Sequence, residues 1–224
     1  HGDLVLQGGA DMDLTWQALQ ALLQRARQRG LTEVRGALVL DRSAFQPARP
    51  ELGVPPFDDA PDAGYNVIAD ALLVNGNLVR VELFADERGL QVVPITPLAG
   101  VRIAHEMTLV DGDCSIWDDG WLAPELRPAR PGRTVDLVLR GSWPARCDRA
   151  VEFNVIERND FIGRLVRALW TGLGGRWRGS VRDGITPTDA TLLAERSSRP
   201  LSELVRAINK PSDNVFSRTL LLAL

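Results

Sequence analysis

The sequence predicts an α/β protein with an inserted all-β module. Residues 1–45 show a strand–helix–strand pattern, whereas residues 66–146 lack helical periodicity and carry short apolar runs between turn residues. Helical periodicity returns after residue 160. The order α/β, then β, then α/β is expected when one domain is inserted into another. We therefore predict a βαβ-type domain that is interrupted by a β domain and followed by a helical end piece.

The first 45 residues justify the βαβ unit. "LVLQGG" (4–9) is a short apolar run that two glycines end. "TWQALQALLQRARQRG" (15–30) places its apolar residues on one helical stripe and stops at Gly30. "EVRGALVLD" (33–41) predicts a second strand about one helix length later. Two strands joined by a helix predict a parallel pair.

The middle of the chain is predicted to be an irregular connection followed by a β module. Residues 46–64 are rich in Pro, Gly and Asp, which indicates irregular structure. In "ALLVNGNLVRVELFAD" (71–86), the Asn75-Gly76 pair between apolar runs predicts a hairpin. Further strands are predicted in "GLQVVPI" (89–95), "VRIAHEMTLV" (101–110) and "TVDLVLRGSW" (134–143).

Helices end the chain. "DFIGRLVRALWTGLGG" (160–175) and "LSELVRAIN" (201–209) have amphipathic spacing, and Pro211 cannot continue the second helix. A new helix is expected near Asp213. The predicted domains are residues 1–65 and 147–196 for the two parts of the α/β domain, 66–146 for the β domain, and 197–224 for the end piece.

Composition excludes several classes of protein. A net charge of -3 gives no reason to expect nucleic-acid binding, and no apolar run approaches the roughly 18 residues that a membrane-spanning helix needs. Cys114 and Cys147 lack a Cys-x-x-Cys spacing and nearby histidines, which argues against zinc. The two cysteines are consistent either with two buried thiols or with one disulfide. The sequence predicts no metal or other cofactor. Apolar elements at both ends predict a segment of a larger protein.

The stretch "KPSDNVFSR" (210–218) has two interpretations. Ser212, Asp213 and Asn214 are residue types that cap helices, because a short side-chain oxygen accepts from the free N–H groups of the first turn. They could also belong to an active site. A Ser-His-Asp triad would have to use His105, which lies in a predicted strand, and no Gly-x-Ser-x-Gly, P-loop or His-Glu-x-x-His motif is present. The local pattern leaves both interpretations open.

Longer stretches resemble a known family. "INKPSDNVFSRTLLLAL" is similar to the Ser-x-Asn region of the D-alanyl-D-alanine carboxypeptidase/endopeptidases of peptidase family S13, which are penicillin-binding proteins. The stretches at 3–45, "GSWPARCDR" (141–149) and 192–214 also resemble that family. One departure is Gly8-Gly9-Ala10-Asp11-Met12, where the family usually has a third Gly and a Pro. The resemblance implies that residues 197–224 are part of a penicillin-binding, transpeptidase-like domain.

The resemblance implies three active-site motifs, of which this chain carries one. Lys210 is the only lysine; Ala207 stands three residues before it and Pro211 follows it, so neither Ser-x-x-Lys nor Lys-Thr-Gly is present. Ser212 is expected to help relay a proton to the leaving group, and Asn214 to bind the acyl side chain and help fix the catalytic lysine. Asp213 is expected to be a cap. The chain alone, without a nucleophile, is expected to be inactive.

The resemblance also implies a location and ligands. The parent enzyme is expected in the periplasm, acting on peptidoglycan stem peptides through an acyl-enzyme and inhibited by β-lactams, with Asp41 near the amine of the stem peptide. Export favours a Cys114–Cys147 disulfide. Two alternatives stay open: a non-catalytic accessory module that binds peptidoglycan, and a cytosolic α/β domain in which residues 212–214 only cap a helix.

Overall fold

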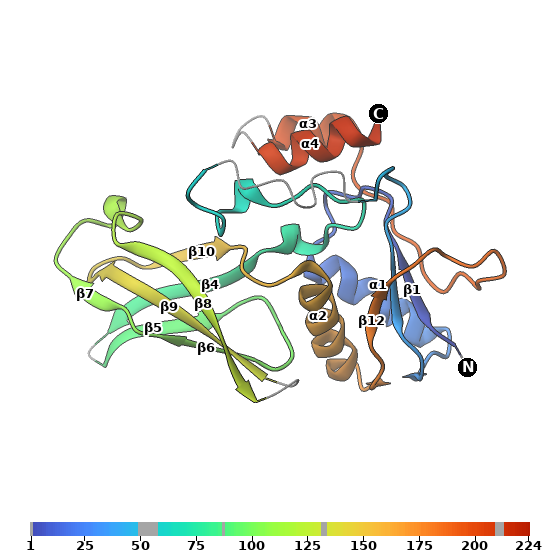
Figure 1. The fold of residues 1–224 in the computed structure, drawn as a ribbon, viewed down its shortest axis with the longest axis horizontal. Coiled ribbons are helices and arrows are strands. Elements are labelled where there is room, and N and C mark those ends of the chain that lie inside the picture. The colour runs from blue at the N-terminus through green and yellow to red at the C-terminus, as the bar shows by residue number, and fades with distance from the viewer. Residues whose placement is uncertain (1, 49–57, 87, 131–133, 209–212) are drawn as a thin grey trace.

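The fold combines helices with several small sheets. The computed structural model describes residues 2–48, 58–86, 88–130, 134–208 and 213–224. Figure 1 shows a group of strands on the left, the helix α2 in the middle and a second group of strands on the right. This mixed α/β arrangement agrees with the predicted fold class. The division into domains stays a prediction.

A parallel sheet follows from the strand–helix–strand pattern. Its strands are β1 (Leu4–Gln7), β3 (Leu38–Asp41) and β12 (Val181–Asp183), in the order β1-β3-β12 with both pairs parallel. Helix α1 (Trp16–Gln28) lies between β1 and β3 in the chain. The predicted βαβ unit is therefore confirmed.

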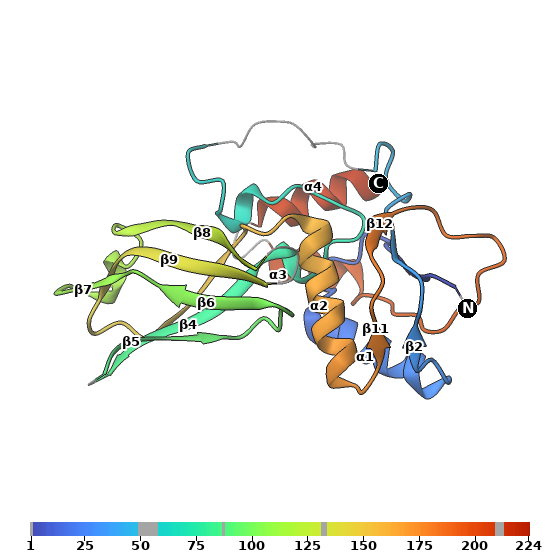
Figure 2. The same cartoon turned by 60° about the horizontal axis from the view of Figure 1, so that its bottom comes forward.

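Two helices share one hydrophobic core with this sheet. Thr15 caps α1 by accepting from the backbone N–H of Ala18, and the apolar stripe of the helix is buried. Helix α2 (Arg158–Gly172) begins after Glu157, whose side chain accepts two backbone N–H groups of its first turn. Both helices pack in the core that contains Leu38 and Leu40 of β3. Figure 2 shows α2 between the two groups of strands.

The predicted strand at 33–41 is two strands. β2 (Glu33–Val34) pairs with β11 (Arg176–Trp177), and β3 pairs with β1 and β12. The chain changes partner at Gly36, where a Cβ atom would lie 2.2 Å from a carboxylate oxygen of Asp3. Only a glycine leaves room for this close approach.

Two further sheets form the β-rich part of the fold. An antiparallel sheet has the order β10-β4-β5, and in the other sheet β9 lies between β6 and β7 and also pairs with β8. Buried residues of β4 and β9 share the main core. The strands are β4 (Val79–Asp86), β5 (Gly89–Pro94), β6 (Val101–His105), β7 (Thr108–Val110), β8 (Trp121–Arg130), β9 (Thr134–Pro144) and β10 (Arg149–Phe153).

A disulfide joins Cys114 to Cys147 in this part of the chain, with 4.7 Å between their Cα atoms. Cys114 begins the short helix η3 (Cys114–Ile116), and Cys147 follows β9 and is fully buried. The indole N–H of Trp143 donates to the carbonyl oxygen of Cys147 at 2.8 Å. The disulfide that the family resemblance favours is therefore present, and two free thiols are excluded.

The hairpin predicted at Asn75-Gly76 is wrong. Both residues lie in the short helix η2 (Val74–Asn77) with φ values of 51° and 59°. The Asn75 N–H donates to the carbonyl oxygen of Leu14 at 2.7 Å, and its side chain accepts from the N–H of Trp16. The left-handed preference of Asn and Gly is thus used in a turn that contacts the start of α1.

Two helices end the chain, as predicted. They are α3 (Leu201–Ile208) and α4 (Asn214–Ala223), and Figure 1 shows them side by side. Pro211, at the predicted corner between them, lies outside the described residues. Within the described part of the chain, no helix combines the length and the apolar character needed to cross a membrane.

Candidate active site

The N-terminus of α4 carries the described part of the Ser-x-Asn motif. Ser212 lies outside the described residues. Asp213 is the N-cap of α4, and its side chain accepts from the N–H of Phe216 at 3.0 Å. This confirms the cap prediction for Asp213. Asn214 is the first helical residue and is exposed. The corner therefore contains both a cap and an exposed amide side chain.

Asn214 lies beside a groove. The groove has a volume of about 380 Å³, and Asp213 and Asn214 line it together with Tyr65, Leu73 and Phe216, among others. Its walls are mostly apolar, whereas the amide of Asn214 offers both a donor and an acceptor. Such a combination suits a ligand that has an apolar part and a peptide-like polar group.

Helix α4 is held on the segment that precedes β4. Val215 packs against Val67 and Leu73 in a small apolar cluster. The guanidinium of Arg218 donates to the carbonyl oxygens of Tyr65 and Val67, at 2.8 and 3.0 Å. We define residues 67–73 as the support segment. The sequence analysis did not predict this support, because the apolar run around residue 70 resembled a strand.

Asp41 ends β3 and is completely buried. One carboxylate oxygen accepts from the N–H of Ser43 at 2.9 Å, and the other accepts from the N–H of Thr186 at 2.7 Å and from the Thr186 hydroxyl. Burial opposes ionisation, but the hydrogen bonds from Thr186 and Ser43 outweigh it and lower the pKa of Asp41 to about 2. The structure thus places Asp41 in a turn that it stabilises, rather than in the groove beside Asn214.

The low pKa of Asp41 predicts a loss of stability in acid. Because the folded pKa lies below the ordinary value of 3.8, the ionised group stabilises the fold above pH 4, and this contribution is lost as the pH falls towards 2. The expected contribution is about 2 kcal/mol. Urea unfolding of wild type and Asp41→Asn between pH 5 and pH 2 measures it. The free-energy difference between the two proteins should shrink as the pH falls, and a constant difference would contradict this assignment.

Comparisons with known proteins agree with the motif. The sequence model of the D-Ala-D-Ala carboxypeptidase 3 (S13) family matches residues 1–224. The D-alanyl-D-alanine carboxypeptidase DacB of Haemophilus influenzae is 24% identical over 243 residues, which cover 99% of this chain and 45% of that protein. The chain thus spans less than half the length of that relative.

Solved structures show the same fold. A crystal structure of penicillin-binding protein 4 (dacB) from Haemophilus influenzae matches with a TM-score of 0.70 and 20% identity, over 99% of this chain and 48% of that one. A second crystal structure of that protein, in complex with a novel β-lactam, matches with a TM-score of 0.59 and 19% identity, over 97% of this chain and 45% of that one. Because the family model covers every residue, the chain belongs to the D-Ala-D-Ala carboxypeptidase 3 (S13) family.

Proposed function

We propose that the chain is the middle part of a serine DD-peptidase that cleaves peptidoglycan stem peptides through an acyl-enzyme. The observation that carries this proposal is the Ser212-Asp213-Asn214 motif, in which Asp213 caps α4 and Asn214 is exposed at a groove. A pure capping function would need only Asp213. An exposed amide next to an apolar groove has the chemistry to hold a peptide substrate.

The two outer residues of the motif have separate roles in this proposal. Ser212 helps relay a proton to the leaving D-alanine or, with a penicillin, to the ring nitrogen. Asn214 hydrogen-bonds the acyl side chain of the substrate and helps hold the catalytic lysine. The nucleophile and that lysine belong to a Ser-x-x-Lys segment that this chain lacks. We use the name three-motif protein for a protein that contains this sequence together with Ser-x-x-Lys and Lys-Thr-Gly segments.

Asp41 is proposed as the residue that meets the amine of the stem peptide. Its carboxylate is ionised and stands at the carboxyl end of a parallel strand, where α/β proteins commonly bind ligands. Both of its oxygens accept hydrogen bonds from Ser43 and Thr186. Because the carboxylate is also completely buried, contact with a substrate amine requires the segment at Thr186 to move away from it.

The disulfide supports the proposed compartment. A Cys114–Cys147 bond persists in an oxidising environment, which supports a periplasmic location for the three-motif protein. Stem peptides and β-lactams are its proposed partners. Penicillin binding also separates this proposal from its rival, an accessory module that binds peptidoglycan without chemistry, because only an enzyme with the upstream serine forms a covalent adduct.

Mass spectrometry of intact protein tests the proposal. The three-motif protein should gain the mass of one penicilloyl group after incubation with benzylpenicillin, because an acyl-enzyme of this kind retains the opened drug. The chain described here should keep its mass, since it has no Ser-x-x-Lys segment. An unmodified three-motif protein would favour the accessory module, and an adduct on the chain alone would contradict the assignment of the nucleophile.

A further inference from the structure

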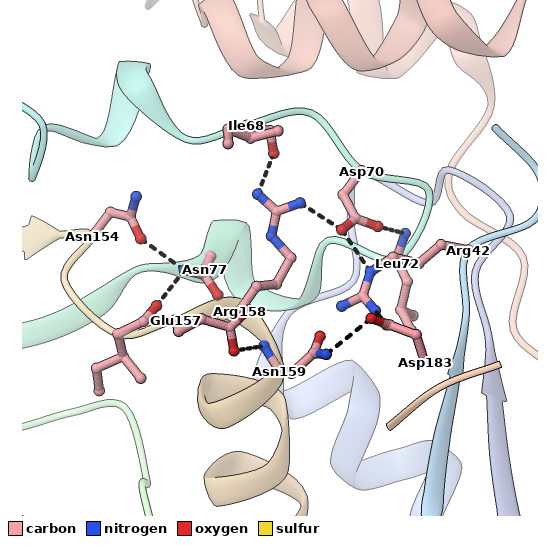
Figure 3. A network of polar contacts seen from close by, with 11 residues as sticks. Arg42, Ile68, Asp70, Leu72, Asn77, Asn154, Glu157, Arg158, Asn159 and Asp183 are labelled. Atoms are coloured by element: carbon pink, nitrogen blue, oxygen red, sulfur yellow. Dashed lines mark hydrogen bonds and ion pairs between the residues drawn. The ribbon is translucent and has the colours of Figure 1, made fainter. Parts of the chain in front are cut away.

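A buried carboxylate, that of Asp70, lies at the centre of a network of polar contacts (Figure 3). One of its oxygens accepts from Nε of Arg42 at 2.6 Å and from a terminal nitrogen of Arg158 at 2.5 Å. The other oxygen accepts from the N–H of Leu72 at 2.7 Å. Arg42 is 3% exposed, so this interaction operates in an environment of low polarity.

The network joins three parts of the fold. Arg42 follows β3, Arg158 is the first residue of α2, and Asp70 belongs to the support segment. Arg42 also pairs with Asp183 at the end of β12. The carboxylate of Asp183 in turn accepts a hydrogen bond from the side chain of Asn159 at 3.2 Å. The network thus ties the support segment to the carboxyl edge of the parallel sheet and to the start of α2.

The arginine contacts fix the backbone of the support segment at two points. A second terminal nitrogen of Arg158 donates to the carbonyl oxygen of Ile68 at 2.7 Å. At the other end, Asp70 holds the N–H of Leu72. Val67 and Leu73, which lie immediately outside these two points, are the residues that pack against Val215 of α4. Asp70 and Arg158 therefore hold the conformation of the support segment under α4.

The order of helix α4 depends on the support segment. It has 10 residues, and isolated helices of that length are marginal in water, so its order comes from docking. We propose that Asp70 is a positioning residue that sets the place of Asn214 by fixing the support segment beneath α4. The proposal rests on the function proposed above for Asn214. Asp70 is completely buried, and the role proposed for it is to position Asn214 through the support segment.

Hydrogen exchange in two variants tests the inference. Asp70→Asn keeps the shape of the side chain but leaves the buried Arg42 and the partly buried Arg158 without its charge, so the support segment should shift. Asp183→Asn is the matched control, because Asp183 pairs with the same Arg42 but is 57% exposed and contacts Asn159 rather than the support segment in the described structure. Amides of α4 should exchange about tenfold faster in Asp70→Asn, which corresponds to the loss of one charge-assisted hydrogen bond. Amides of β8 and β9 should not change.

A kinetic readout follows in the three-motif protein. Asp70→Asn should slow acylation by benzylpenicillin about tenfold with little change in the noncovalent binding constant, whereas Asp183→Asn should leave both values within about twofold. If Asp70→Asn does not fold, Arg158→Lys replaces it, since lysine keeps the charge but cannot hold Asp70 and the Ile68 carbonyl together.

The outcomes separate this inference from the proposed function. Faster exchange confined to α4, together with slower acylation, supports the inference. Unchanged α4 exchange, or equal loosening of α4 and β9, overturns it. If the wild-type three-motif protein forms no adduct at all, the proposed function fails, and exchange in α4 still decides whether Asp70 positions this helix.

Discussion

Replacing Asn214 with alanine should lower the rate of acylation of the three-motif protein by benzylpenicillin about a hundredfold. The proposed role gives Asn214 two hydrogen bonds, one to the acyl side chain of the substrate and one to the catalytic lysine. Losing two such bonds of about 1.4 kcal/mol each raises the barrier by about 2.8 kcal/mol. Stopped-flow or quenched-flow measurement of adduct formation gives the rate.

Folding stability should hardly change in the same variant. Asn214 is exposed, and the cap of α4 is provided by Asp213. Substitutions at such surface positions change stability by about 0.5 kcal/mol or less. Ser217→Ala, also at an exposed position in α4, is the matched control: it removes a hydroxyl that donates to the carbonyl oxygen of Asp213 one turn back, and it should react at the wild-type rate. Wild-type acylation in Asn214→Ala would remove Asn214 from the site, and a parallel fall in melting temperature would assign it a structural role instead.

Local patterns predicted the helices well, for a physical reason. In α1, the residues that the core buries recur at helical spacing. The apolar stripe that ends at Ala26 can therefore be recognised from residues in neighbouring turns of the helix. The cap at Asp213 is similarly local, because the carboxylate and the N–H that it accepts are three residues apart. In both cases the interacting residues lie within a few positions of each other, so the sequence pattern alone predicts the structure.

Contacts between residues far apart in the sequence could not be predicted from local patterns. The Asn75-Gly76 pair favours left-handed backbone in any setting, and the contacts of Asn75 with Leu14 and Trp16, far away in the sequence, hold it in a turn at α1 instead of a hairpin. Asp70 is an acid within an apolar run, and the chain has 26 lysine and arginine residues, so the sequence could not single out Arg42 and Arg158 as its partners. The support of Asn214 could therefore be seen only in the folded chain.

The disulfide variant Cys114→Ser should lose about 3–4 kcal/mol of unfolding free energy. The two cysteines are 33 residues apart, and the entropy that a crosslink of this span removes from the unfolded chain corresponds to that value. For a chain of this size, the melting temperature should fall by about 10 °C. Thermal unfolding under oxidising conditions, monitored by tryptophan fluorescence, reports the change, because Trp143 donates to the Cys147 carbonyl oxygen.

Two comparisons make the disulfide experiment specific. Ser115→Ala alters the neighbouring exposed side chain without touching the crosslink and should melt with the wild type. Wild type treated with a reductant should melt with Cys114→Ser, since both lack the bond. Equal melting temperatures of wild type and Cys114→Ser under oxidising conditions would refute the stabilising role.

The same variant separates the stability of the β-rich part from the chemistry of α4. Cys114 packs against the main core, whereas Val215 and Phe216 of α4 belong to two smaller clusters. Below its melting temperature, a three-motif protein with Cys114→Ser should therefore still form the penicilloyl adduct at close to the wild-type rate. A protein that depends on this bond for about 3–4 kcal/mol would be poorly stable in a reducing compartment, and this dependence is the physical reason for proposing export.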